Sequence, residues 1–237
     1  MTRRKAIVLK AIRIVAFILV FCAVFTIGGC KPKLWSVDFT TVTDLDDWSG
    51  DGTYLLNDGG VVGLRLDEDS WVLAPVVFKG NFDLTVVFAL LGKSGGNGAF
   101  EVGFSGEEED IHETAAYFEL IETASEDVGY GAYEIDWDDD HIYHNLFYDI
   151  GPMPSMHFDG STLNTLLINK VGDHFKVYMN GTLLFEYNQG QYYDSSFYSV
   201  WIWGGSFSNV DDWVVFKSIK VEYWGTKIGR ASCRERV

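Results

Sequence analysis

Three acidic side chains near the middle of the chain have a spacing that could support acid–base chemistry. They are Glu134, Asp136 and Asp139, in the segment YEIDWDD. Because side chains alternate along a β-strand, Glu134 and Asp136 should share one face, with Tyr133 and Ile135 on the other face, towards the core. Carboxyl groups on one face can act as acid or base, or accept hydrogen bonds from hydroxyl groups. The pattern indicates either a reactive site or a polar binding surface.

The same acids have two simpler interpretations. The run Asp138–Asp140 is typical of a solvated turn at the end of a strand. Closely spaced carboxylates over 136–140 also suit a hard cation such as Ca²⁺, although no EF-hand pattern is present. Apart from this calcium hypothesis, the sequence predicts no cofactor and no metal. His141 and His144 are three apart in a predicted strand, so they should point to opposite faces and make a poor metal pair.

Two tryptophans form a second group of residues that could bind a ligand. Trp201 and Trp203 are two residues apart in the run VWIWGG, so they should share one face of a strand. An exposed indole ring can stack on the apolar face of a pyranose, and Tyr192 in the preceding loop could extend that surface. The alternative is that both indoles pack inward, because tryptophan is usually largely buried.

The elements that position these residues are predicted to be strands. No stretch after Lys31 shows sustained helical periodicity, and short apolar runs bounded by Gly, Asn and Asp recur about every 8–12 residues, as in a sandwich or barrel. The sequence predicts strands over Trp71–Phe78, Phe82–Leu91, Phe100–Ser105, Ala115–Glu122, Tyr130–Trp137, Ile142–Asp149, Leu163–Asn169, Phe175–Met179, Thr182–Tyr187, Tyr198–Trp203 and Trp213–Tyr223.

The clearest local signal is the pair Asn180-Gly181 between HFKVYM and TLLFEY. Both residues tolerate positive φ, so the pair predicts a two-residue type I′ hairpin. The segment Val171-Gly172-Asp173 predicts another hairpin just before it. The segment Asp44–Gly60, which is rich in Asp and Gly, indicates a surface loop around a short strand.

The charge of the central body is strongly negative. Of the 18 cations, five lie in the first 29 residues and three in the last ten, and one of the 34 acids lies in the last ten. The body between them therefore carries ten cations, 33 acids and a formal charge of −23. Phosphate backbones are repelled by such a surface, which excludes nucleic acid as a partner and leaves cations and neutral sugars.

The first 29 residues have the order of an export signal. A basic segment is followed by the uncharged apolar run Ile14–Ile27 and by small residues before a cysteine, Ile27-Gly28-Gly29-Cys30. These last four residues resemble the lipobox of bacterial lipoproteins, in which the cysteine, here Cys30, receives a diacylglycerol. The resemblance implies an extracytoplasmic protein held in a membrane by lipid; an uncleaved N-terminal anchor is the alternative. Lys31, not Asp, follows Cys30, which by analogy with enteric bacteria favours the outer membrane or cell surface.

The last ten residues, 228–237, read IGRASCRERV and resemble the in-frame translation of a sequencing adapter. We therefore expect three parts: a signal peptide over 1–29, one domain over 30–227 and a read-through tail over 228–237.

The second half of the body contains INKVGDHFKVYMNGTLLFEY, VWIWGG and VVFKSIKVEYW, and the first half contains DFTTVTDLDDWSG, VVGLRLD and NFDLTVVFALLG. Together these segments resemble the concanavalin A-like superfamily of lectins, laminin-G domains and glucanases. The similarity spans Phe39–Tyr223. It implies an all-β domain, a two-sheet antiparallel β-sandwich of jelly-roll type.

The resemblance also gives roles to the acids. Retaining laminarinases of this superfamily carry Glu-x-Asp-x-x-Glu, which supplies nucleophile, assisting acid and general acid/base. Glu134, Asp136 and Asp139 stand in those places, but Asp139 is one methylene shorter than the glutamate. Such enzymes need their two carboxyl groups about 5–5.5 Å apart.

These observations favour binding over catalysis. We expect a lipid-anchored domain that binds carbohydrate on its concave sheet, through Trp201, Trp203 and Tyr192, with hydrogen bonds from Glu134 and Asp136. A retaining-type glycoside hydrolase that uses the three acids is one alternative. A structural envelope lipoprotein without a small ligand is another.

Overall fold

The computed structural model describes one β-rich body. It covers residues 32–42, 44–50, 53–58, 61–66, 70–91, 98–106, 113–120, 127–136, 142–153, 155–191, 193, 197–204 and 213–225, with backbone only at 53–58, 61, 91, 98, 113–120, 136, 142 and 213. The chain divides after Lys31, and the described residues all belong to the second unit. Within these ranges, no helix has the length and apolar character needed to cross a membrane.

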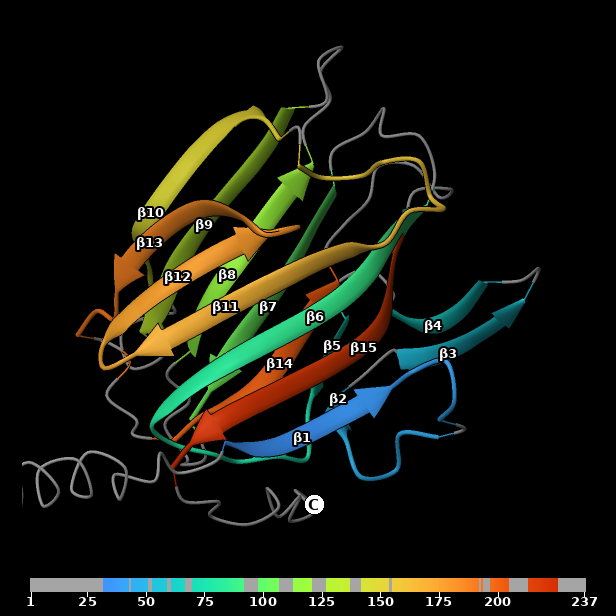
Figure 1. The fold of residues 1–237 in the computed structure, drawn as a ribbon, viewed down its shortest axis with the longest axis horizontal. Coiled ribbons are helices and arrows are strands. Elements are labelled where there is room, and N and C mark those ends of the chain that lie inside the picture. Colours follow the sequence, from blue (N-terminus) through green and yellow to red (C-terminus); the bar gives the residue numbers. More distant parts are fainter. Residues whose placement is uncertain are drawn as a thin grey trace, which may run out of the picture. The chain divides into compact units, whose positions relative to one another are not determined.

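The described strands form two antiparallel sheets that lie face to face (Figure 1). Sheet A has the order β13-β12-β11-β6-β15-β4-β3, with β1 also paired to β15. Its strands are β1 (Lys33–Asp38), β3 (Thr53–Asp58), β4 (Val61–Leu66), β6 (Asn81–Leu91), β11 (Asn164–Val171), β12 (His174–Met179), β13 (Thr182–Asn188) and β15 (Trp213–Trp224).

Sheet B has the order β10-β9-β8-β7-β14-β5-β2. Its strands are β2 (Ser49–Gly50), β5 (Ser70–Leu73), β7 (Gly98–Ser105), β8 (Glu113–Leu120), β9 (Asp127–Asp136), β10 (Ile142–Pro152) and β14 (Ser199–Gly204). Neighbours in this order come from distant parts of the sequence, since β14 lies between β7 and β5. The predicted all-β, antiparallel two-sheet fold is therefore confirmed.

The core fills the space between the two sheets. Strand alternation places large aromatic side chains on the inner faces, where Phe82 of β6 meets Phe104 of β7 with ring centroids 4.8 Å apart. Phe88 of β6 and Phe100 of β7 meet in the same way at 5.1 Å. All four rings are fully buried. Because burying one such ring contributes roughly 1.5–3 kcal/mol, aromatic packing holds this fold together.

Both predicted hairpins are present in sheet A, the first where Val171 of β11 pairs with His174 of β12. Tyr178 pairs with Leu183, and the intervening turn has Asn180 at φ 50 and Gly181 at φ 81, as a type I′ turn requires. The Asn180 side chain also reaches beyond its own turn. Its Oδ1 accepts the Thr165 backbone N–H at 2.7 Å, and its Nδ2 donates to Asn164 Oδ1 at 3.0 Å and to the Ser155 carbonyl.

We expect Asn180→Gly to lower the free energy of unfolding by about 1–3 kcal/mol, because the half-buried N–H of Thr165 loses its acceptor. The turn itself survives this change, since glycine tolerates positive φ. Urea denaturation measures the difference, with Thr182→Ala as a control on the exposed neighbouring position. Equal stability of Asn180→Gly and the control would show that the side-chain network contributes nothing.

Candidate functional site

Glu134 points into the sandwich. In the strand register it pairs with Thr114, which pairs with Phe104, which in turn pairs with Val200. Directly paired residues of neighbouring strands point to the same face, and both Phe104 and Val200 are fully buried between the sheets. Glu134 is fully buried as well. The prediction that Glu134 lies on the face of β9 away from the core is therefore wrong.

The carboxyl group of Glu134 ties a loop to sheet B. Its Oε1 accepts the backbone N–H of Gly190 at 2.6 Å, and its Oε2 accepts that of Tyr193 at 3.4 Å. These donors lie in the connection between β13 and β14. A Cβ on Gly190 would come within 2.3 Å of Glu134 Oε2, so any larger residue there would displace the Glu134 carboxylate. This arrangement gives Glu134 a structural role that the strand pattern did not predict.

The opposite face of β9 belongs to a separate apolar cluster. Tyr133 pairs with Ala115, which pairs with Gly103, and Gly103 pairs with Trp201. Tyr133 and Trp201 therefore lie on the same face of sheet B, the face turned away from sheet A. Trp203, two residues further along β14, shares it. We call this surface the outer face of sheet B.

The side chains of the outer face differ in exposure, and the buried ones form the floor of this surface. Tyr133, Ile135 and Trp201 are buried and pack together, with Leu73 and Trp203 partly buried against them. The indole N–H of Trp201 is buried and has no hydrogen-bond partner among the described residues. Since only 6% of Trp201 is exposed, this residue supports the surface more than it presents one.

Accessible aromatic rings lie on both sides of that floor. Trp71, the cross-strand partner of Trp203, is 40% exposed. On the edge strand β10, Tyr143 is 62% and Tyr148 45% exposed, and Tyr143 contacts Tyr133 edge-on with ring centroids 5.2 Å apart. Together these rings form an aromatic surface that crosses sheet B from β5 to β10.

One carboxyl group on the outer face was missed by the sequence analysis. Glu101 of β7 pairs directly with Trp203, and its Oε2 accepts a hydrogen bond from the Tyr133 hydroxyl. Burial of the carboxyl raises the pKa of Glu101 to about 7, although the Tyr133 hydrogen bond opposes the shift. Near neutral pH this group exists in both forms, so it can accept or donate a hydrogen bond. The available signal was the alternation in FEVGF, which places Glu101 opposite the buried phenylalanines.

The other predicted site residues are not placed. Cys30, Asp139 and Tyr192 lie outside the described residues, as does the side chain of Asp136. Their roles, and calcium binding at 136–140, stay predictions. Among the side chains that the structure describes, no three His, Cys, Asp or Glu residues are grouped to hold a metal ion. His144 pairs with Glu134 and thus faces inward, away from the outer face.

Comparison with known proteins gives a likeness of fold without a likeness of sequence. No protein-family model matches the chain, and no curated protein matches it. LamAcat from Zobellia galactanivorans has a TM-score of 0.56 at 12% identity, covering 80% of this chain and 96% of its own. The glycoside hydrolase family 16 endo-glucanase from Bacteroides ovatus also scores 0.56 at 12% identity, over 79% and 98%.

A third structure has a similar fold. The CBM2 module of the evolved Dit protein of Lactobacillus casei BL23 phage J-1 scores 0.56 at 14% identity, over 82% of this chain and all of the module. At such identities the likeness concerns the fold alone. The body of this chain therefore has the two-sheet antiparallel jelly-roll fold that these three structures share.

Proposed function

We propose that this chain is a lipid-anchored extracytoplasmic protein that binds carbohydrate on the outer face of sheet B. The observation that carries the proposal is the combination of accessible indole rings, Trp71 and Trp203, with the carboxyl group of Glu101 beside them. Rings of this kind stack on the apolar face of a sugar, while a carboxyl group pairs with its hydroxyls. Trp201 supports the surface from below.

The charge of the body limits the class of glycan that can bind. A formal charge of −23 over the region between the signal and the tail repels uronic acids and other polyanions. Neutral glycans avoid this repulsion. The proposed ligand is therefore a neutral oligosaccharide, bound across several strands because the aromatic rings extend from β5 to β10.

The lipid anchor rests on the sequence of the first 30 residues. A basic segment, an uncharged apolar run and Ile27-Gly28-Gly29-Cys30 have the order that acylation of Cys30 requires. A diacylglycerol with a further acyl chain holds a domain stably in a membrane. The proposed location is outside the cytoplasm, at the outer membrane or cell surface.

The binding surface is tested by replacing its two indole rings. We expect Trp71→Ala and Trp203→Ala each to weaken binding of a neutral β-glucan oligosaccharide at least tenfold, or about 1.4 kcal/mol, in isothermal titration calorimetry. Trp224→Ala is the matched control, because Trp224 is 39% exposed, as Trp71 is 40%, but lies in sheet A. Thermal shifts with a panel of neutral glycans identify the ligand beforehand.

Other outcomes identify the alternatives. If no neutral glycan shifts the wild-type melting temperature, the chain is better explained as a structural envelope lipoprotein. Release of reducing ends from a glucan, abolished by Glu134→Gln without loss of folding, would instead indicate a glycoside hydrolase. The buried, loop-bound position of Glu134 is the reason we place that outcome second.

A further inference from the structure

Two large apolar side chains are exposed side by side at one end of sheet A. Leu34 of β1 is 62% exposed, and Trp224 at the end of β15 is 39% exposed. Leu34 pairs with Glu222, which lies two residues before Trp224 on the same face of β15. The two apolar side chains are thus diagonal neighbours, about 7–8 Å apart between their backbones.

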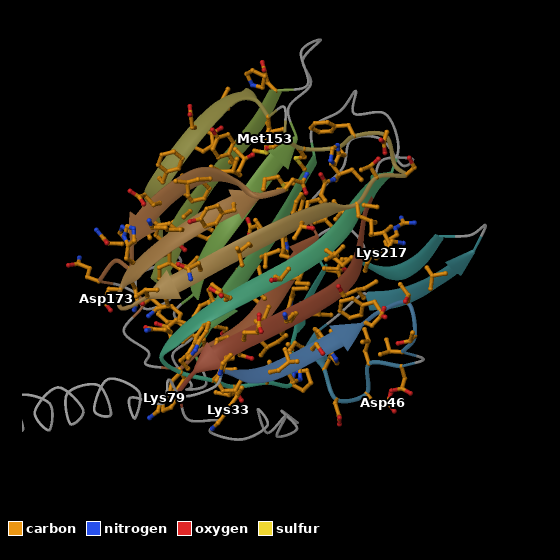
Figure 2. All side chains as sticks on the ribbon, in the orientation of Figure 1. Lys33, Asp46, Lys79, Met153, Asp173 and Lys217 are labelled. Carbon is orange, nitrogen blue, oxygen red and sulfur yellow. The ribbon has the colours of Figure 1, made fainter. Side chains whose placement is uncertain are left out.

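Two lysines lie at the same end of the sandwich as this pair. Lys33 is exposed at the first position of β1 and pairs with Tyr223, so it points to the face opposite to Leu34. The backbone at Lys79 lies against the end of β15, since a Cβ on Gly225 would come within 1.9 Å of the Lys79 carbonyl oxygen, and its partly buried side chain places the ammonium 5.7 Å from the centroid of the Phe197 ring. Figure 2 shows Lys33 and Lys79 at the same end of the sandwich, opposite Met153. We call Leu34, Trp224, Lys33 and Lys79 the basal patch.

The acids nearest the patch on sheet A already have partners. Glu222 forms an ion pair with Lys220 at 2.9 Å. Asp83, its cross-strand partner on β6, accepts a hydrogen bond from Asn169 at 2.6 Å. In a body with so few cations, two lysines beside two exposed apolar side chains give this end a composition suited to a lipid headgroup region.

The chain itself brings this end close to the proposed anchor. Only two residues separate Cys30 from Lys33, and an extended chain spans at most about 3.6 Å per residue. The Cα atom that carries the lipid is therefore within about 11 Å of the Cα atom of Lys33. An acyl chain inserted in a bilayer holds this end at the membrane surface, whereas the far end is free to tilt.

We propose that the basal patch docks on the membrane in which Cys30 is anchored. Leu34 and Trp224 enter the headgroup region, and Lys33 and Lys79 meet lipid phosphates. Tryptophan suits this environment, because its ring is apolar and its N–H is polar. The inference rests on the lipid anchor of the proposed function, and it adds that the domain has a fixed orientation instead of moving freely on its tether.

Docking at this end keeps the glycan surface accessible. Tyr198 pairs with Phe78, next to Lys79, and β14 runs from there away from the basal patch. Trp203 lies five residues beyond Tyr198, which at about 3.4 Å per residue is roughly 17 Å further along the strand. The outer face of sheet B therefore stands beside the membrane, turned towards neither the bilayer nor the anchor.

The test uses the acylated full-length protein in vesicles of phosphatidylethanolamine and phosphatidylglycerol. All variants carry Cys233→Ser, and a fluorescent probe is attached through Ser36→Cys, which is exposed on the same face of β1 as Leu34, or, as the control at the far end beside Met153, through Pro152→Cys. We expect headgroup spin-labelled lipid to quench the probe at 36 at least twofold more than the probe at 152. Leu34→Asn with Trp224→Asn should remove this difference while the protein still floats with the vesicles.

The outcomes separate the two proposals. If the protein fails to float and mass spectrometry finds Cys30 unmodified, the lipid anchor itself is wrong. If the protein floats but both probes are quenched equally, the anchor stands and docking is refuted. Quenching at 36 that survives the double substitution also overturns the basal patch. Because both substituted side chains are exposed, unchanged circular dichroism confirms that the variant is folded.

Discussion

Replacing Glu134 with alanine should lower the free energy of unfolding by about 2–5 kcal/mol. The substitution leaves the N–H groups of Gly190 and Tyr193 without the acceptor they have at 2.6 and 3.4 Å, inside a site where Glu134 is fully buried. An unpaired buried donor costs about 1–3 kcal/mol, and the lost side-chain volume adds a cavity cost. Guanidinium denaturation followed by tryptophan fluorescence measures the change.

Two further variants show whether the loop contact is responsible. Glu222→Ala removes a partly exposed carboxyl group of sheet A and should change the denaturation midpoint far less. Gly190→Ala should destabilise the wild type, because its Cβ would come within 2.3 Å of Glu134 Oε2, and should cost less once Glu134 is alanine. Additive effects of Glu134→Ala and Gly190→Ala would contradict the proposed contact between the two residues. So would a Glu134→Ala protein as stable as the wild type.

This result bears on how activity data are interpreted. A glucanase activity lost in Glu134→Ala would say little about catalysis, because the fold loses a buried contact at the same time. Glu134→Gln keeps the shape and one acceptor for Gly190. It is therefore the variant that separates a chemical role from a structural one.

Replacing Glu101 with glutamine should stabilise the protein above neutral pH. The pKa of Glu101 is raised from its ordinary 4.5 to about 7 by burial. Below about pH 4.5 the group is protonated in both folded and unfolded chains, so it costs nothing. Between about pH 4.5 and pH 7 the unfolded chain ionises while the folded chain keeps its proton, so stability falls by up to about 3 kcal/mol; above about pH 7 both states are ionised and the loss stays constant. Glutamine cannot ionise, and its side-chain oxygen can still accept the hydrogen bond from the Tyr133 hydroxyl.

The measurement is a pair of denaturation series at pH 4.5 and pH 8. We expect wild type and Glu101→Gln to be similar at the lower pH and to separate at the higher one, with the variant more stable. Glu222→Gln serves as the control for removing one negative charge from an acidic body. Parallel pH profiles for wild type and Glu101→Gln would show that Glu101 is solvated in the folded state.

Much of the architecture could be predicted because its signals are local. Asn180-Gly181 specifies its turn through backbone conformation alone, and the strands flanking it follow at once. The face shared by Trp201 and Trp203 follows from strand alternation in the same way. β1 was missed, since it is an edge strand whose exposed side chains resemble a loop.

The orientation of β9 could not be predicted, because both of its faces are apolar. Tyr133 and Ile135 favoured one face as the core, but they belong to the outer cluster with Trp201. The true inner face carries Val128 and Ala132, which are smaller. Alternation gives two faces but does not say which is inward. That depends on the other sheet, which the strand itself does not encode.

The side chain of Asn180 has a practical consequence for producing this protein. Asn180-Gly181-Thr182 is an acceptor sequence for N-linked glycosylation in a eukaryotic secretory pathway. The nitrogen that an oligosaccharyltransferase would modify is the one that donates to Asn164 and Ser155. A glycan attached there before folding removes a donor and blocks the approach of the 155–165 segment. Secretion from yeast or mammalian cells should therefore yield misfolded material, whereas a bacterial host leaves that amide intact.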